Sequence, residues 1–202
     1  MSAARGSLDD VQGWWLVSYV IMWLLLAALT IVVVALARQI GTLHLRLGPR
    51  GALEVDDEGP ALGEAPPQEE TTDAQGLPAR IGGPGEAQLL LFVSPGCHLC
   101  EQVLPSLPVI ARSHELKPYV LADVDAEETV SQYERRRLAA RIVSAVEIGQ
   151  RYRVPGTPYV VVLDALGVVR AKGTVNNLEQ LEGLVETGAQ RAEEAARERR
   201  AS

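Results

Sequence analysis

Residues 88–105 read QLLLFVSPGCHLCEQVLP and contain both cysteines of this 202-residue chain, Cys97 and Cys100. The segment 88–94 is a continuous apolar run bounded by turn formers, which predicts a strand buried on both faces. From residue 98 to 113 apolar side chains recur at helical spacing, and Pro105 and Pro108 are expected to kink that helix. The stretch therefore predicts strand, turn and helix, with C-x-x-C opening the helix.

This arrangement gives the two thiols different roles. The first sulfur lies over free backbone N–H groups at a helix N-terminus, where a thiolate is favoured. We therefore interpret Cys97 as the nucleophile that attacks a partner disulfide, and Cys100, about one turn deeper, as the resolving thiol. A charged His98 would favour the thiolate further, although the same side chain could simply point to solvent.

Two other interpretations of the cysteines are disfavoured. Two buried small hydrophobic residues would explain them without chemistry, but their helical spacing and sole occurrence disfavour this. A structural zinc usually takes four ligands, and His44 and His114 are isolated in sequence. We expect no metal and no cofactor apart from the redox-active disulfide itself.

A second signal is Thr157-Pro158, directly before a strand-like apolar run. A trans proline is awkward at that position, so a cis bond fits, whereas a simple strand-start proline is the alternative. Combined with the cysteine motif, the cis form is favoured.

The rest of the second half has α/β character. Strands are predicted over 119–125, 159–163 and 168–172, the last two around a tight turn at 165–167. The charged stretch 127–149 has helical composition, and TTDAQGLPARIG could form a small hairpin. A final helix is expected from Asn177, its cap, with Leu178, Leu181, Leu184 and Val185 on one face.

The first half of the chain differs from the second because it contains a long apolar segment without charge. Residues 14–37 carry no charge over 24 residues, a helix of about 36 Å at ~1.5 Å per residue, long enough to cross a bilayer. A cleaved signal peptide and a buried soluble helix are the alternatives, and a retained anchor is favoured because the apolar run is long for a signal core. The expected organisation is leader 1–13, transmembrane helix 14–37, tether 38–61, folded domain 62–188 and charged tail 189–202.

Charge excludes one class of partner. The formal net charge is −7, and no basic patch with interleaved aromatic residues is present. Nucleic-acid binding requires clustered Lys and Arg, so none is expected.

These motifs resemble the thioredoxin superfamily. C-x-x-C follows a strand, Pro105 stands where that family kinks its active-site helix, and Thr157-Pro158 matches its cis-proline beside the disulfide. The resemblance implies a thioredoxin-like α/β fold, a central mixed sheet flanked by helices, joined here to one N-terminal transmembrane helix.

A closer resemblance is to the MauD family, membrane-tethered accessory proteins of methylamine utilisation. It is carried by LARQIGTLHLRLGPRGAL, LFVSPGCHLC and GVVRAKGTVNNLEQLEGLVE. It implies a domain on the extracytoplasmic side of the plasma (inner) membrane that assists disulfide formation or maturation of the disulfide-rich methylamine dehydrogenase small subunit. Arg38, Arg46 and Arg50 follow the anchor and only Arg5 precedes it, so the positive-inside rule by itself favours the opposite orientation.

The sequence departs from the thioredoxin pattern at two positions. Many thioredoxins carry a buried carboxylate six residues before the first cysteine, where this chain has Leu91, and an aromatic residue directly before it, where this chain has Gly96. Proton transfer from Cys100 must then use water or another group, and the face around Cys97 is expected to be more open.

The leading hypothesis is a membrane-anchored thiol-disulfide oxidoreductase that acts on protein thiols or disulfides. It needs protein substrates, the lipid bilayer, and a membrane or soluble redox partner that regenerates the pair; the direction of transfer is open. The alternative is a non-catalytic maturation or docking partner on the same scaffold. A thiol peroxidase is a third reading, disfavoured because Ser94 occupies the position of the peroxidase threonine and the earlier proline is missing.

Overall fold

A computed structural model describes residues 14–34, 57–133 and 138–201, with the side chains of 130–133 excepted. The chain divides into two units, Met1–Gly48 and Pro49–Ser202, each of which is described by itself.

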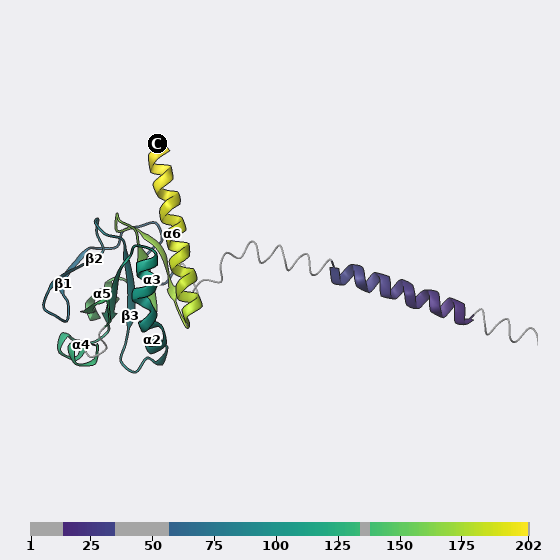
Figure 1. Ribbon diagram of the computed structural model, residues 1–202, viewed down its shortest axis with the longest axis horizontal. Helices are drawn as coiled ribbons and strands as arrows, with labels where there is room; N and C mark the ends of the chain where they lie inside the picture. The colour runs from purple at the N-terminus through teal and green to yellow at the C-terminus, as the bar shows by residue number, and fades with distance from the viewer. Residues whose placement is uncertain (1–13, 35–56, 134–137, 202) are drawn as a thin grey trace, which may run out of the picture. The chain divides into compact units, whose positions relative to one another are not determined.

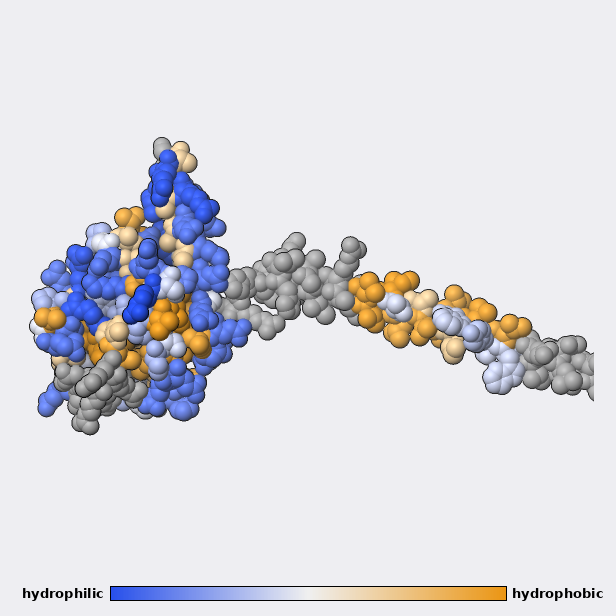
Figure 2. Space-filling model, viewed as in Figure 1, coloured by the Kyte–Doolittle hydropathy of each residue, from blue (hydrophilic) through white to orange (hydrophobic). Residues whose placement is uncertain are grey.

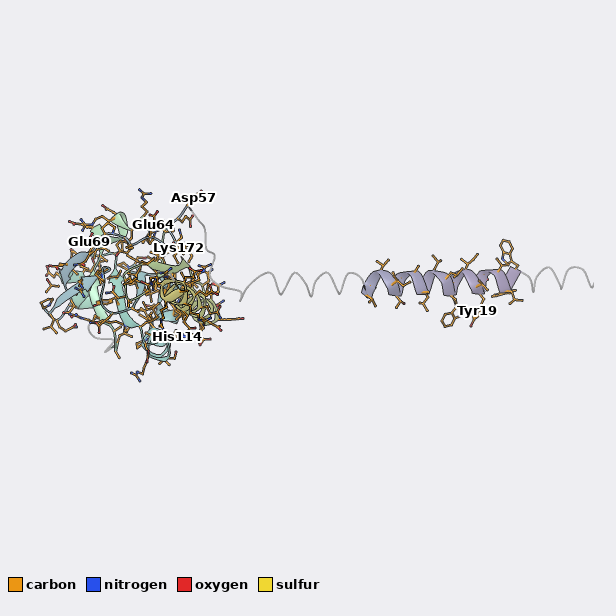
Figure 3. All side chains as sticks on the ribbon, turned by 90° about the horizontal axis from the view of Figure 1, so that it is seen from above. Tyr19, Asp57, Glu64, Glu69, His114 and Lys172 are labelled. Atoms are coloured by element: carbon orange, nitrogen blue, oxygen red, sulfur yellow. A yellow bond between two sulfur atoms is a disulfide. The ribbon has the colours of Figure 1, made fainter. Side chains whose placement is uncertain are left out.

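The first unit contains one described helix, Trp14–Val34. Its 21 residues are long and apolar enough to cross a membrane, and none of the window that meets this test is buried against other parts of the chain. Large apolar side chains are exposed along it, many of them on the face seen in Figure 2, and the ring of Tyr19 projects from its first turns (Figure 3). The helix supports the expected single-pass anchor; residues 35–37 of that expectation lie outside the described residues.

The second unit is built on a five-stranded mixed sheet in the order β5-β4-β3-β6-β7. Figure 1 labels β3, the middle strand of this sheet. The central strand β3 (Gln88–Val93) is buried at every residue, as the sequence predicts. It pairs in parallel with β4 and antiparallel with β6. The remaining strands of the sheet are β4 (Lys117–Ala122), β5 (Arg141–Ser144), β6 (Tyr159–Leu163) and β7 (Val169–Thr174).

Alternate residues of β3 enter two separate cores. Leu89 and Leu91 pack with the helices α2 (His98–Val103), α3 (Leu107–Ser113) and α6 (Leu178–Ala201). Leu90 and Phe92 pack on the other face with α5 (Val146–Arg151) and strand β2 (Pro78–Ile81). The period-2 alternation of a strand thus supplies both faces of the sheet, and the expected thioredoxin-like layering is confirmed.

The predicted hairpin is present. Strands β1 (Glu69–Thr72) and β2 (Pro78–Ile81) pair antiparallel. Asp73, in the turn between them, receives hydrogen bonds from the backbone N–H groups of Gln75 and Leu77 and from the Arg141 guanidinium on β5, at 2.6 Å for the shortest. Burial alone would raise the pKa of Asp73, but these bonds and the Arg141 charge lower it below its ordinary value. The carboxylate therefore ties the hairpin to the sheet.

One sequence-based expectation is wrong. The stretch 127–149 is not a continuous helix: after α4 (Ala126–Tyr133), β5 adds an edge strand to β4 before α5 begins at Val146. Strand β5 contains only four residues, with Ile142 and Val143 buried. Pairing with β4 and burial of these two side chains override the helical composition of the neighbouring sequence.

The last helix follows the prediction in most respects. The Asn177 side chain accepts from the Gln180 N–H at 2.9 Å and caps the start of α6, as expected. Leu181, Leu184 and Val185 are buried, whereas Leu178, the first residue of the helix, is 43% exposed. The helix continues through the expected tail as far as Ala201.

The folded contacts begin before Leu62, the expected start of the domain. The Glu58 carbonyl accepts from Lys172 Nζ at 2.6 Å and from the Tyr159 hydroxyl at 3.1 Å. Lys172 is fully buried (labelled in Figure 3). Gly59 has φ +72°, and a Cβ there would overlap the Tyr159 ring, so this close crossing requires glycine. The segment from Glu58 onward thus packs with the domain.

Candidate redox site

The two cysteines lie at the carboxyl end of the central strand. Four residues, Ser94 to Cys97, connect β3 to α2, and Gly96 makes the turn with φ +70°. The Cys97 N–H donates to the Ser94 carbonyl at 3.3 Å, which closes the turn. Cys97 is the N-cap residue of α2, as the sequence predicts.

The cysteines form a disulfide, with Cα atoms 5.3 Å apart. Cys97 is half-buried and Cys100 is 2% exposed. The Cys100 backbone N–H donates to Cys97 Sγ at 3.1 Å. The outer sulfur therefore combines access to a partner with a donor that stabilises negative charge, which fits the nucleophilic role expected for Cys97.

The helix that carries the pair is broken at the predicted prolines. Helix α2 is followed by a 3₁₀ turn, Leu104–Ser106, which contains Pro105, and α3 has Pro108 in its first turn. Val103, Leu104 and Leu107 anchor this segment in the core. The disulfide is therefore carried by a segment whose apolar side chains are buried in the core.

The cis-proline expectation is confirmed: the Thr157–Pro158 peptide bond is cis. Thr157 Oγ1 lies 2.6 Å from Ser94 Oγ, so a hydroxyl pair joins the proline loop to the turn that carries Cys97. Sequence reasoning identified Thr157 but missed Ser94 as its partner, because the two residues are 63 positions apart. No local sequence pattern predicts a contact between residues so far apart in the chain.

His98 is exposed, and the structure pairs its ring with Gln102, one turn further along the helix, at 3.1 Å. No hydrogen bond from the His98 ring to a cysteine sulfur is found among the described residues. Its tuning role stays a prediction.

The surroundings of Cys100 are apolar. Leu91, at the position where many thioredoxins carry a carboxylate, is fully buried in the same core cluster as Cys100. The buried acids Asp73 and Asp164 instead make ion pairs with Arg141 and Arg170. In the described parts of the chain, no group of His, Cys, Asp and Glu side chains could hold a metal ion.

The sheet order and the disulfide at the start of a broken helix fit the thioredoxin-like fold that the sequence predicts. The methylamine utilization protein MauD of Paracoccus denitrificans is 37% identical over 173 residues, which cover 84% of this chain and 86% of the relative. MauD of Methylorubrum extorquens is 36% identical over 173 residues, 84% of each chain. The chain belongs to the MauD family.

Solved structures support the fold. A candidate protein disulfide isomerase from Bacteroides thetaiotaomicron matches with a TM-score of 0.57 at 17% identity, covering 70% of this chain and 98% of that one. A thio-disulfide isomerase from Thermus thermophilus matches with a TM-score of 0.50 at 23% identity, covering 63% and 96%. At this identity the likeness shows the fold alone. No family model matches the chain.

Proposed function

We propose that this protein is a membrane-anchored thiol-disulfide oxidoreductase that acts on other proteins. One observation carries the proposal: an accessible sulfur, Cys97, receives a backbone N–H and is bonded to a buried partner, Cys100. A two-thiol unit of this kind is sufficient for disulfide exchange without a metal or an organic cofactor.

The exchange proceeds in two balanced steps. In the reduced protein the Cys97 thiolate attacks one sulfur of a substrate disulfide, forms a mixed disulfide and releases the other substrate sulfur as a thiolate. Cys100 then loses its proton and attacks Cys97 Sγ, which frees the second substrate sulfur and restores the disulfide. The reverse sequence oxidises a substrate dithiol. Because Cys100 lies in an apolar core cluster, we propose that its proton passes to water or to another group that enters beside Cys97.

The proposal also names a class of substrate and the side of the membrane on which the domain lies. The MauD relatives are methylamine utilization proteins, and we propose a disulfide-rich client such as the methylamine dehydrogenase small subunit. The domain is proposed to face the extracytoplasmic side, where disulfides persist. A membrane or soluble redox partner regenerates the pair. The basic residues after the anchor oppose this orientation, so it needs a direct test: a C-terminal tag in intact cells is expected to react with an impermeant reagent, and a protected tag would place the domain inside.

The activity is tested by trapping. In a Cys100→Ser variant the resolving step is removed, so mixed disulfides through Cys97 should accumulate in membranes and disappear on reduction. The matched control, Cys97→Ser together with Cys100→Ser, should trap nothing. If no adduct forms, the oxidoreductase proposal is contradicted. A double variant that supports client maturation as well as the parent chain would favour a docking partner without redox turnover.

A further inference from the structure

The chain enters the folded domain through residues 58–64, the entry segment, which is hydrogen-bonded along the edge strand β7. The Gly63 N–H donates to the Val169 carbonyl at 2.9 Å, and the Val169 N–H donates to the Glu64 carbonyl at 2.9 Å. The entry segment therefore packs as a part of the domain.

The start of the entry segment also contacts the proline loop, residues 153–158. The Gly59 N–H donates to the Arg153 carbonyl at 3.1 Å. The hydroxyl of Tyr159, the residue directly after the loop, donates to the Glu58 carbonyl at 3.1 Å. Two neighbouring residues of the entry segment are thus bonded to both ends of the loop.

A buried charge fastens this junction. Lys172 on β7 is fully buried, and its Nζ donates to the Glu58 carbonyl at 2.6 Å. Burial of an ammonium costs free energy, whereas an apolar side chain of the same length would fill the space without that cost. A charged donor makes a stronger hydrogen bond to a carbonyl than a neutral donor does. Core packing therefore does not explain a lysine at this position, and its bond to the entry segment does.

The contacts of the proline loop continue to the redox site. Arg153 has a φ of +52°, a conformation that side-chain-bearing residues rarely adopt and that persists where surrounding contacts hold it. The Arg153 carbonyl is the acceptor that Gly59 binds. At the other end of the loop, Thr157 Oγ1 lies 2.6 Å from Ser94 Oγ, in the turn that carries Cys97. Hydrogen bonds thus link the entry segment to the proline loop and the proline loop to that turn.

We propose that the entry segment positions the proline loop against the turn that carries Cys97, and that Lys172 is a positioning residue that acts through the Glu58 carbonyl. The inference rests on the proposed function, because the reactivity that this positioning would set is that of Cys97 in disulfide exchange. It gives the segment through which the chain enters the domain a role in the redox site besides attachment.

The test uses the full chain in detergent with Cys100→Ser, so that Cys97 is the one cysteine left. Gly59→Ala keeps the Lys172 ammonium but places a Cβ against the Tyr159 ring at a φ of +72°. Lys172→Met removes the ammonium and keeps a long apolar side chain. If Gly59→Ala does not fold, Tyr159→Phe replaces it, because that change deletes one bond to the entry segment and adds no atom.

Amide hydrogen exchange reports whether the loop keeps its place. The Arg153 and Val154 N–H groups donate to the carbonyls of Gln150 and Gly149, so they exchange slowly while the loop is ordered. We expect both variants to accelerate this exchange by about tenfold or more, the scale of losing a hydrogen bond to a charged group. The acceleration should be larger in the loop than in β3. Ile142→Ala, a buried change on the opposite edge strand β5, should not favour the loop over β3.

The second readout is the rate at which iodoacetamide alkylates Cys97 at neutral pH, which a merely structural role would not change. We expect Gly59→Ala and Lys172→Met to slow alkylation about 2- to 10-fold, the upper limit being loss of the whole hydrogen bond to Cys97 Sγ. The matched control Lys117→Met removes the same charge at the start of β4, where Lys117 pairs with Glu86, and should leave the rate unchanged.

The assignment is overturned if the Gly59 variant or the Lys172 variant leaves loop exchange or Cys97 alkylation as in the parent Cys100→Ser chain. A slower rate in Lys172→Met alone would show a direct effect of the charge, and equal slowing in Lys117→Met would show a general one. A chain with an intact entry segment that traps no substrate through Cys97 would instead refute the proposed function, and loop exchange would still report on the entry segment.

Discussion

Replacing Cys100 by proline and, separately, by serine isolates the effect of a single backbone N–H on the reactivity of Cys97. That N–H lies 3.1 Å from Cys97 Sγ; serine retains it and proline removes it. Cys100 lies in the first turn of α2, where backbone N–H groups have no acceptor within the helix, so proline removes no helical hydrogen bond. Both variants lack the resolving thiol, so their comparison reports on the loss of the N–H together with the restriction that proline places on the backbone of Leu99.

The expected magnitude follows from the charge on the acceptor. A hydrogen bond to a charged group contributes about 1.5–3 kcal/mol, which changes the thiolate population roughly 10- to 100-fold when most of the thiol is protonated. A more stable thiolate is also a weaker nucleophile, with a Brønsted coefficient of about 0.4–0.5. Only about half of the logarithmic change therefore reaches the rate, and the proline variant should react about 3- to 10-fold more slowly than the serine variant.

The assay is the second-order rate of alkylation by iodoacetamide at neutral pH, with the full chain in detergent. Far-ultraviolet circular dichroism is the control, and it should show the same helix content for both variants. Equal rates for the two variants, or a faster rate for the proline variant, would refute the role given to the helix start.

Three further predictions concern stability, measured by urea unfolding. Ser94→Ala should lower the free energy of unfolding by about 0.5–1.5 kcal/mol, because it removes the hydroxyl partner of Thr157, and Ser94→Thr should retain it; equal losses would contradict the pair. The lowered pKa of Asp73 contributes stability that is present above about pH 4 and lost as the pH falls through that lowered pKa, so Asp73→Asn should reduce the acid sensitivity of unfolding, and an unchanged pH profile would contradict this. Leu107→Ala, at a fully buried position, should cost about 2–5 kcal/mol, whereas Val109→Ala, which is 67% exposed, should cost almost nothing; similar costs would show that the core is misplaced.

The parts of the fold that the sequence predicts are those with strong local signals. The apolar run of β3, the prolines at Pro105 and Pro108, and the Asn177 cap each act within a few residues, and the structure has all of them. Strand β5 was missed because four residues within a charged, helix-favouring stretch carry too little pattern. Its identity depends on pairing with β4, which is not a local property.

The same distinction applies to the site. Cys97 and Cys100 were recognised from one short motif. The cis Thr157–Pro158 bond was predicted from the position of the proline before a strand, in combination with that motif. The Ser94 hydroxyl pair could not be found this way, since its two residues meet only when the sheet has formed.

The central claim is that Cys97 and Cys100 act as one reversible redox unit. The full chain is equilibrated in detergent with buffers of increasing ratio of reduced to oxidised glutathione, and the free thiols are counted by mass after alkylation. We predict that both thiols appear together in a single two-electron transition. A pair that resists reduction, or thiols that accumulate separate glutathione adducts without forming the Cys97–Cys100 disulfide, would contradict the account.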